Sequence, residues 1–300
     1  MPMTPQEGEM YIMSKNQNVK ISGFADEIHE DFEIQLSVMK KLGQKYIEFR
    51  SADGIGVAQM TEEQIEAYKR RLDEADIQVS AIGSPIGKIM ITDEFAPHLE
   101  TFRHIIKTAH SMKTPYIRMF SFFIPEGESA ETYRDEVFRR MRILVDCAKE
   151  NQVVLLHENE KDIYGDTAPR CRELMEEFYG EHFKCTFDFA NFVQCEQDTL
   201  EAYHMLKPYI SYIHIKDAKK DTKEVVLPGE GDGHVVEILK KFYEESFEGY
   251  VSLEPHLSSF ALLDQLELSH QEKKELDGNR AYRVAFERLC TLLDEVGYSY

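Results

Sequence analysis

The stretch VVLLHENEKD, residues Val153 to Asp162, starts with four aliphatic residues and then turns abruptly polar and acidic. A short continuous apolar run of this kind is typical of a strand buried on both faces of a parallel sheet. The acids begin where such a strand would reach the surface. The stretch therefore predicts a core strand whose carboxyl end carries candidate functional residues.

Similar β-rich runs recur on both sides of this stretch, and charged segments with apolar residues at helical spacing separate them. The predicted strands are 19–24, 45–50, 77–84, 115–123, 152–158, 183–189, 209–217 and 249–255. The predicted helices are 31–43, 61–77, 131–152, about 94–112, 166–179, 198–207 and 233–245, and a last one near 279–296. Gly43 stops the helix over 31–43, and Thr61 with Gln64 forms a capping box for the helix over 61–77.

Strict alternation of strands and helices predicts the α/β class with a parallel sheet, and eight such units fit a single (β/α)₈ TIM barrel. A doubly wound open sheet is the alternative, but no glycine-rich dinucleotide motif follows the first predicted strand. The run GIGVAQ, Gly54 to Gln59, is interpreted as a loop. The domain hypothesis is a barrel over residues 19–300, preceded by a loosely ordered polar leader over residues 1–18 rather than a signal peptide.

The composition argues against several classes of partner. The formal net charge of −20 disfavours binding to a phosphate backbone, so nucleic acid is not an expected partner. An apolar run long enough for a membrane span is missing from the sequence. The five cysteines form no CxxC pair and are interpreted as reduced thiols of a cytoplasmic protein.

Four polar residues stand at the ends of the last four predicted strands: Glu158, Asp188, His214 and Glu254. In a TIM barrel the active site lies at these carboxyl ends. Side chains two residues apart along a strand share a face, so those two positions before the four polar residues also point inward: Leu156, Thr186, Tyr212 and Ser252. The side chains between them would face the helices: Leu155, Phe187, Ile213 and Leu253. We therefore expect all four polar residues to point into the barrel mouth, and His157, of opposite parity, to meet a helix.

Three carboxylates and an imidazole in one buried cup would repel one another unless a cation neutralised them. The sequence thus predicts one divalent metal ion held by Glu158, Asp188, His214 and Glu254. Oxygen-rich ligation with one nitrogen suits Mn²⁺, Mg²⁺ or Co²⁺ better than a thiolate-type Zn²⁺ site.

The string HENE, FDFANF, YIHIKDA, GEGDG and SLEP resembles the sugar phosphate isomerase/epimerase family of the xylose isomerase-like TIM barrels. The spacings of 30, 26 and 40 residues between the four candidate ligands are similar to those of its ketose 3-epimerase branch. The resemblance implies a carbohydrate substrate, a homodimer, and roles for Glu158 and Glu254 as catalytic acid and base as well as metal ligands. Asp188 and His214 would be ligands alone.

Further residues are candidates for substrate binding. Lys216 and His256 share the inward parity of the ligands, although Lys216 could equally be a solvated lysine beside Asp217. Glu48 and Arg50 share one face of the second predicted strand, and Arg118 is expected to face inward on the fourth. The three residues are expected either to contact a substrate or to pair with one another. Glu160 is expected to lie outside the ligand shell or in solvent, and GEGDGH, Gly229 to His234, to form a loop over the mouth.

Three positions that would grip the sugar depart from the 3-epimerase branch. A Glu and a His of the branch correspond to Tyr164 and Asn191 here, and an Arg corresponds to Lys220. The function hypothesis is therefore a metal-dependent sugar isomerase or epimerase that works through an enediolate, without a named sugar. The alternatives are an inosose or keto-sugar dehydratase with the same site and a non-catalytic sugar-binding barrel. A DNA-repair endonuclease would need more His ligands and a basic face.

Overall fold

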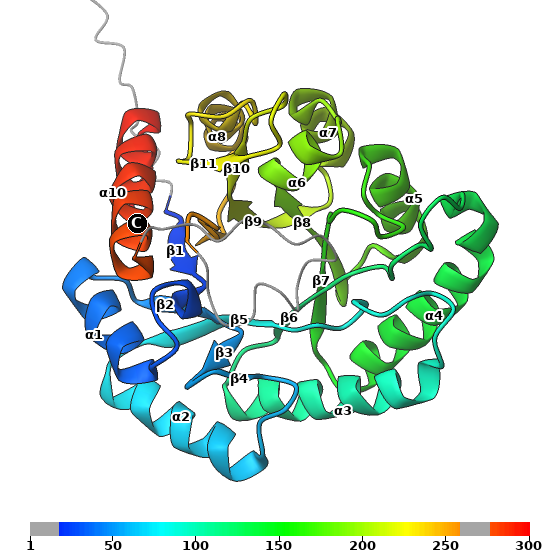
Figure 1. Ribbon diagram of the computed structural model, residues 1–300, viewed down its shortest axis with the longest axis horizontal. Coiled ribbons are helices and arrows are strands. Elements are labelled where there is room, and N and C mark those ends of the chain that lie inside the picture. The colour runs from blue at the N-terminus through cyan, green and yellow to red at the C-terminus, as the bar shows by residue number, and fades with distance from the viewer. Residues whose placement is uncertain (1–17, 259–276) are drawn as a thin grey trace, which may run out of the picture.

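The computed structural model describes residues 18–258 and 277–300 (Figure 1). The predicted leader over residues 1–18 therefore lies outside the described residues, except for Asn18. Asn18 forms an isolated bridge with Ser299, which joins the two ends of the described chain.

Eight parallel strands form the central sheet, in the order β1-β12-β9-β8-β7-β6-β5-β2. Their bounds are β1 Lys20–Gly23, β2 Tyr46–Phe49, β5 Gln78–Gly83, β6 Tyr116–Met119, β7 Val154–Glu158, β8 Phe183–Asp188, β9 Ile210–Ile215 and β12 Tyr250–Leu253. The end strands β1 and β2 lie next to each other, so the sheet curls into a nearly closed barrel surrounded by helices (Figure 1). The predicted TIM barrel is confirmed.

Most of the described helices cover the outside of this barrel: α1 Phe32–Leu42, α2 Glu62–Glu74, α3 Phe95–Ser111, α4 Ala130–Glu150, α5 Ala168–Phe178, α7 Thr199–Leu206, α8 Val235–Glu244 and α10 Gly278–Val296. Two short helices, η1 Ala25–Glu27 and α6 Phe189–Gln194, follow the carboxyl ends of β1 and β8 at the barrel mouth. Local sequence signals begin and end several of them. The predicted capping box of Thr61 and Gln64 opens α2, and Gly43 ends α1 with a left-handed backbone at φ 72°.

Three short elements differ from the sequence prediction. The run Gly54–Gln59 was expected to be a loop, but its β4, Ile55–Gly56, pairs with β3, Ser51–Ala52, in a small antiparallel hairpin. A second hairpin joins β10, Asp217–Ala218, to β11, Val225–Val226. The helix α6 starts directly after β8 and has only 6 residues, which is too short for a periodic pattern to stand out.

Side chains alternate along the strands as the sequence predicts. Leu155, Phe187, Ile213 and Leu253 belong to the main apolar core between sheet and helices. Leu156 and Tyr212 form a separate small cluster with Ala81 inside the barrel. Full burial of an aliphatic side chain stabilises the fold by about 1.5–3 kcal/mol. A register shift of one residue would turn the outward-facing set into the barrel interior and the inward-facing set towards the helices. The alternation therefore fixes which side chains reach the mouth.

The inward residues of neighbouring strands are staggered along the ladder. Glu158 pairs with Thr186, whereas Asp188 pairs with His214, and His214 pairs with Ser252. Glu254 lies two residues beyond Ser252. This stagger is expected of tilted strands in a barrel. Among the described residues, none of the helices has the length and apolarity needed to cross a membrane.

Candidate metal centre

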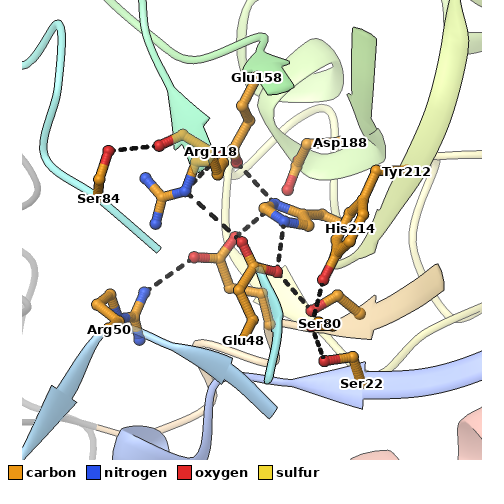
Figure 2. A network of polar contacts seen from close by, with 12 residues as sticks. Ser22, Glu48, Arg50, Ser80, Ser84, Arg118, Glu158, Asp188, Tyr212 and His214 are labelled. Carbon is orange, nitrogen blue, oxygen red and sulfur yellow. Dashed lines mark hydrogen bonds and ion pairs between the residues drawn. The ribbon is translucent and has the colours of Figure 1, made fainter. Parts of the chain in front are cut away.

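Glu158, Asp188, His214 and Glu254 meet at the carboxyl ends of β7, β8, β9 and β12, which are consecutive in the sheet. Each offers one ligand atom, and these atoms all lie within 4.8 Å of one another. Nδ1 of His214 lies 3.0 Å from Oε1 of Glu158 and 3.6 Å from Oε2 of Glu254. Figure 2 shows the imidazole of His214 beside Glu158 and Asp188. The structure therefore brings the four predicted ligands together in one buried cluster.

The charges of this cluster favour the binding of a cation. Burial raises the pKa of Asp188 to about 7, and the charges of Glu158 and Glu254 add to that rise against the opposing effect of Lys216. For His214, burial favours the neutral ring, but the charges of Glu158 and Glu48 outweigh it and raise the pKa well above its usual value. Both shifts show carboxylates crowded together in a site of low polarity.

Three buried atoms of the cluster make no hydrogen bond within the described residues, although each lies beside a charged side chain. They are Oε2 of Glu158, 3.3 Å from Nε of Arg118, Oδ2 of Asp188, 3.3 Å from Nζ of Lys216, and Nδ1 of His214, 3.0 Å from Oε1 of Glu158. Buried polar atoms in folded proteins are otherwise almost always paired. Three carboxylate donors and one imidazole nitrogen make a ligand set for a hard or intermediate divalent cation. The residues present therefore fit a bound metal ion.

Comparison with known proteins identifies the family. The family model described as xylose isomerase-like TIM barrel matches residues 36–283. The chain belongs to the xylose isomerase-like TIM barrel family. The resemblance predicted from the sequence is confirmed at this level, and the matched range includes all four candidate ligands. None of the curated protein sequences matches the chain.

Several solved structures are similar to this chain over most of its length. The probable 3-DHS dehydratase AsbF involved in petrobactin synthesis from Bacillus anthracis has TM-score 0.70 and 17% identity, covering 91% of this chain and 99% of that one. An L-ribulose 3-epimerase has TM-score 0.71 and 15% identity, covering 93% and 95%. The IOLI protein with a bound zinc atom has TM-score 0.70 and 15% identity, covering 93% and 99%. Identities this low show the shared fold alone.

Arg118 and Asn191 hold Glu158 in this xylose isomerase-like barrel. Nε of Arg118, on β6, lies 3.3 Å from Oε2 of Glu158, and the amide of Asn191 donates to Oε1 at 3.4 Å. The guanidinium of Arg118 packs 4.5 Å from the ring centroid of Phe120. The backbone N–H of Asn191 also donates to Oδ1 of Asp188 at 2.7 Å. Both predicted substrate-binding residues thus contact candidate metal ligands.

Lys216 is buried rather than solvated. Its Nζ lies 3.3 Å from Oδ2 of Asp188 and 3.2 Å from Oε2 of Glu254. Glu160 is also buried, and its Oε2 lies 3.1 Å from Nζ of Lys88. Burial opposes ionisation of Glu160, but Lys88 and Lys216 outweigh it and lower its pKa to about 2. The solvated alternatives for Lys216 and Glu160 are therefore wrong.

His256 faces inward as predicted, and it meets an acid that the sequence reasoning missed. Nε2 of His256 lies 3.3 Å from Oε1 of Glu254 and 3.5 Å from Oε1 of Glu27. Burial favours the neutral ring, but Glu27 outweighs it, with further help from Glu254, and the pKa of His256 rises to about 9. Asp26 and Glu27 lie on η1, directly after β1. Their position after the first strand, in the run FADEI, is the sequence signal that could have identified them.

Glu27, Glu254 and His256 also lie close enough together to hold an ion. Arg50, however, already supplies positive charge to this group. Its NH1 lies 3.1 Å from Glu254, its NH2 lies 3.3 Å from Glu27, and its Nε lies 2.8 Å from Asp26. Arg50 therefore neutralises these acids from within the fold, as Lys216 and Arg118 do in part for the cluster around His214 Nδ1.

Of the remaining predicted residues, Glu48 contacts a candidate ligand, and Lys220 and His157 lie away from the cluster. Glu48 contacts His214 and Ser252 at the barrel centre. Lys220 is exposed on the segment after β10, where its backbone N–H donates to Asp232. His157 is buried on the outer face of β7, and its Nε2 lies 3.0 Å from Oγ of Ser121. Burial lowers the pKa of His157 to about 3, which is consistent with a neutral core residue.

The GEGDG loop is tied to Asp217. The backbone N–H groups of Gly229, Gly231 and Gly233 donate to its carboxylate at 2.9, 2.9 and 3.0 Å. A Cβ at Gly231 would lie 2.2 Å from Oδ1 of Asp217, so the close approach requires glycine there. These contacts fix the path of the loop between β11 and α8.

Proposed function

We propose that the chain is a divalent-metal-dependent sugar isomerase or epimerase that moves a proton at the carbon next to a carbonyl. The observation that carries this proposal is the row Glu158, Asp188, His214 and Glu254, in which a glutamate stands at each end. Two carboxylates separated by two other ligands can approach a bound ligand from two sides. One can remove a proton while the other returns one, which inverts a carbon.

Neighbouring side chains support separate proton-transfer roles for Glu158 and Glu254. Arg118 and Asn191 orient Glu158, whereas Arg50, Lys216 and His256 surround Glu254. Burial of Glu254 opposes its ionisation, but Lys216 and His256 outweigh that effect and hold its pKa well below the usual value. The Nζ of Lys216 lies 3.3 Å from Asp188 and 3.2 Å from Glu254. We propose that it stabilises the negative charge that develops on a substrate.

A bound Mn²⁺, Mg²⁺ or Co²⁺ would polarise the carbonyl and stabilise the enediolate formed when the neighbouring proton leaves. Glu158, Asp188, His214 and Glu254 would hold it. The IOLI structure with zinc and the L-ribulose 3-epimerase support a metal site and sugar chemistry on this fold, respectively. The proposal includes a cytoplasmic location, for which the unpaired cysteines of the sequence are the support.

A dehydratase is the second candidate. One structurally similar protein is named a 3-DHS dehydratase. Removal of the same proton could be followed by loss of a β-hydroxyl, and the Lys216 ammonium is placed to donate a proton to a leaving oxygen. The two functions differ in mass balance, because a dehydratase releases water and an epimerase does not.

The test is incubation of the purified protein and Mg²⁺ with keto sugars and inososes in D₂O, followed by NMR. Deuterium uptake at a carbon next to the carbonyl, without loss of water, would support an isomerase or epimerase. A product lacking one water would support the dehydratase. If none of the substrates exchanged a proton and the protein bound them unchanged, a non-catalytic sugar-binding barrel would replace both.

A further inference from the structure

Glu48 of β2 reaches across the barrel to His214 of β9. Its Oε2 lies 3.0 Å from Nε2 of His214, on the side of the ring opposite the ligand cluster (Figure 2). Both side chains are fully buried. Nδ1 of the same ring faces Glu158 and Glu254. The two nitrogens of His214 therefore have different partners, and only Nδ1 faces the atoms that could share a metal ion.

The surroundings of Glu48 require it to accept hydrogen bonds. Ser252 donates its Oγ–H to Oε2 of Glu48 at 2.7 Å, and Nε of Arg118 lies 3.9 Å from Oε1. Arginine remains protonated in proteins and has no acceptor, so it favours a carboxylate at Glu48 over a carboxylic acid. A carboxylate can only accept. The contact with His214 must then be a donation from Nε2–H.

The ring plane of His214 is also held by aromatic side chains. Phe24 packs edge-on against it at 5.3 Å and 81°, and Tyr212 does so at 5.7 Å and 80°. Tyr212 is in turn held by a hydrogen bond of 2.8 Å with Ser80 (Figure 2). A ring fixed in plane and bonded at one nitrogen has one remaining direction for its lone pair, which is that of Nδ1.

We propose that Glu48 is a positioning residue that fixes the Nε2–H form of His214 and thereby presents the Nδ1 lone pair to the metal ion. This inference rests on the proposed metal site and departs from the sequence expectation that Glu48 contacts substrate. A histidine ligand whose second nitrogen donates to a carboxylate is a better electron donor, and loss of such a carboxylate typically weakens metal binding 10–100-fold.

The test compares wild type with Glu48→Gln. The amide can donate to the ring as well as accept from it, so it no longer imposes one protonated nitrogen. Calorimetric titration with Mn²⁺ should show affinity lower by about 10–100-fold in Glu48→Gln. Long-range ¹H–¹⁵N correlation of histidine-labelled, Zn²⁺-loaded protein should show a protonated Nε2 and a metal-bound Nδ1 at His214 in the wild type. The resonance is assigned by its loss in His214→Gln.

Two further variants separate this role from general effects. Glu160→Gln removes another buried carboxylate of the mouth that does not contact His214, and we expect its Mn²⁺ affinity to stay within about threefold of wild type. Ser252→Ala keeps the Glu48 carboxylate but removes one donor to Oε2, and we expect an intermediate loss. It also provides a readout if Glu48→Gln does not fold.

The outcomes separate this inference from the proposed function. Wild-type protein that binds none of the divalent ions would overturn both the metal-dependent function and the role of Glu48. Wild-type binding with equal affinity in Glu48→Gln would overturn the role of Glu48 alone. So would a spectrum in which Nε2 of His214 binds the metal, or a loss of affinity in Glu160→Gln as large as that in Glu48→Gln.

Discussion

The ammonium of Lys216 lies 3.2 Å from the carboxylate Oε2 of Glu254, the residue proposed to transfer a proton. The same Nζ lies 3.3 Å from Asp188. An internal cation thus sits against two of the four candidate ligands. It compensates part of their negative charge, and it would compete with the proposed divalent ion for the same oxygens.

Lys216→Gln should therefore lower the free energy of unfolding of the metal-free protein and raise its affinity for a divalent metal ion. Breaking a buried ion pair typically costs about 3–5 kcal/mol, because the partner charges are left uncompensated. The more negative site should bind Mn²⁺ about tenfold more tightly, which is about 1.4 kcal/mol. Urea unfolding with chelator and calorimetric titration measure the two effects. The exposed Lys220→Gln is the matched control, and an equal change in both variants would contradict the assignment.

Glu158→Gln and Glu254→Gln should each reduce turnover of an epimerised substrate by about 10²–10⁴-fold, since each removes one proton-transferring group. If the two glutamates act from opposite sides, each variant should still exchange the proton of one epimer with D₂O while blocking interconversion. NMR with each epimer as starting material measures this. Interconversion of the epimers at the wild-type rate in either variant would contradict the assignment of Glu158 and Glu254 as the two proton-transferring groups.

Metal binding should stabilise the fold. A ligand at 100 times its dissociation constant adds about 2.7 kcal/mol to the free energy of unfolding. Thermal unfolding of chelator-treated protein should therefore shift to higher temperature on addition of Mn²⁺. Asp188→Asn removes a ligand carboxylate at the centre of the cluster and should abolish the shift. A shift that survives in Asp188→Asn would place the ion elsewhere.

Gly231→Ala should disrupt the loop tied to Asp217, because the added Cβ would lie 2.2 Å from Oδ1 of that carboxylate. Overpacking of this kind costs about 1–3 kcal/mol, which chemical denaturation can measure. Gly180→Ala is the control, since a Cβ there meets nothing within 4 Å. Equal stability of the two variants would show that the loop is not held by this contact.

Acid should destabilise the protein through His98. Its Nε2 accepts the backbone N–H of Gly87 at 2.8 Å, which requires the unprotonated nitrogen. Burial, with a further contribution from Arg140, lowers the pKa of His98 to about 4 from 6.5. Because the unfolded chain binds this proton first, the stability contributed by neutral His98 is complete above pH 6.5 and is lost as pH falls towards 4.

The measurement is the free energy of unfolding of wild type and His98→Gln between pH 7 and pH 4. The difference between them should fall by on the order of 3 kcal/mol over this range, because Gln does not titrate. A difference independent of pH would mean that His98 is not the group responsible.

Local patterns predicted most of the fold. The continuous apolar runs at Val153–Leu156 and in the other strands, separated by amphipathic helices, specified a parallel barrel, which the structure confirms. Short elements escaped prediction. The six-residue α6 and the β3–β4 hairpin are too brief for periodicity, and they form because Asp188 caps α6 and turn residues at Asp53 and Gly54 adopt positive φ.

The sequence by itself determined which strands end in Glu158, Asp188, His214 and Glu254, because strand alternation and the carboxyl-end rule for barrels are local properties of the chain. Tertiary structure alone decided what surrounds these residues. Glu48 reaches His214 over 166 positions, and Arg50 reaches Glu254 over 204 positions. Such contacts depend on the curvature and stagger of the closed sheet, which bring distant side chains to the same height inside one cup.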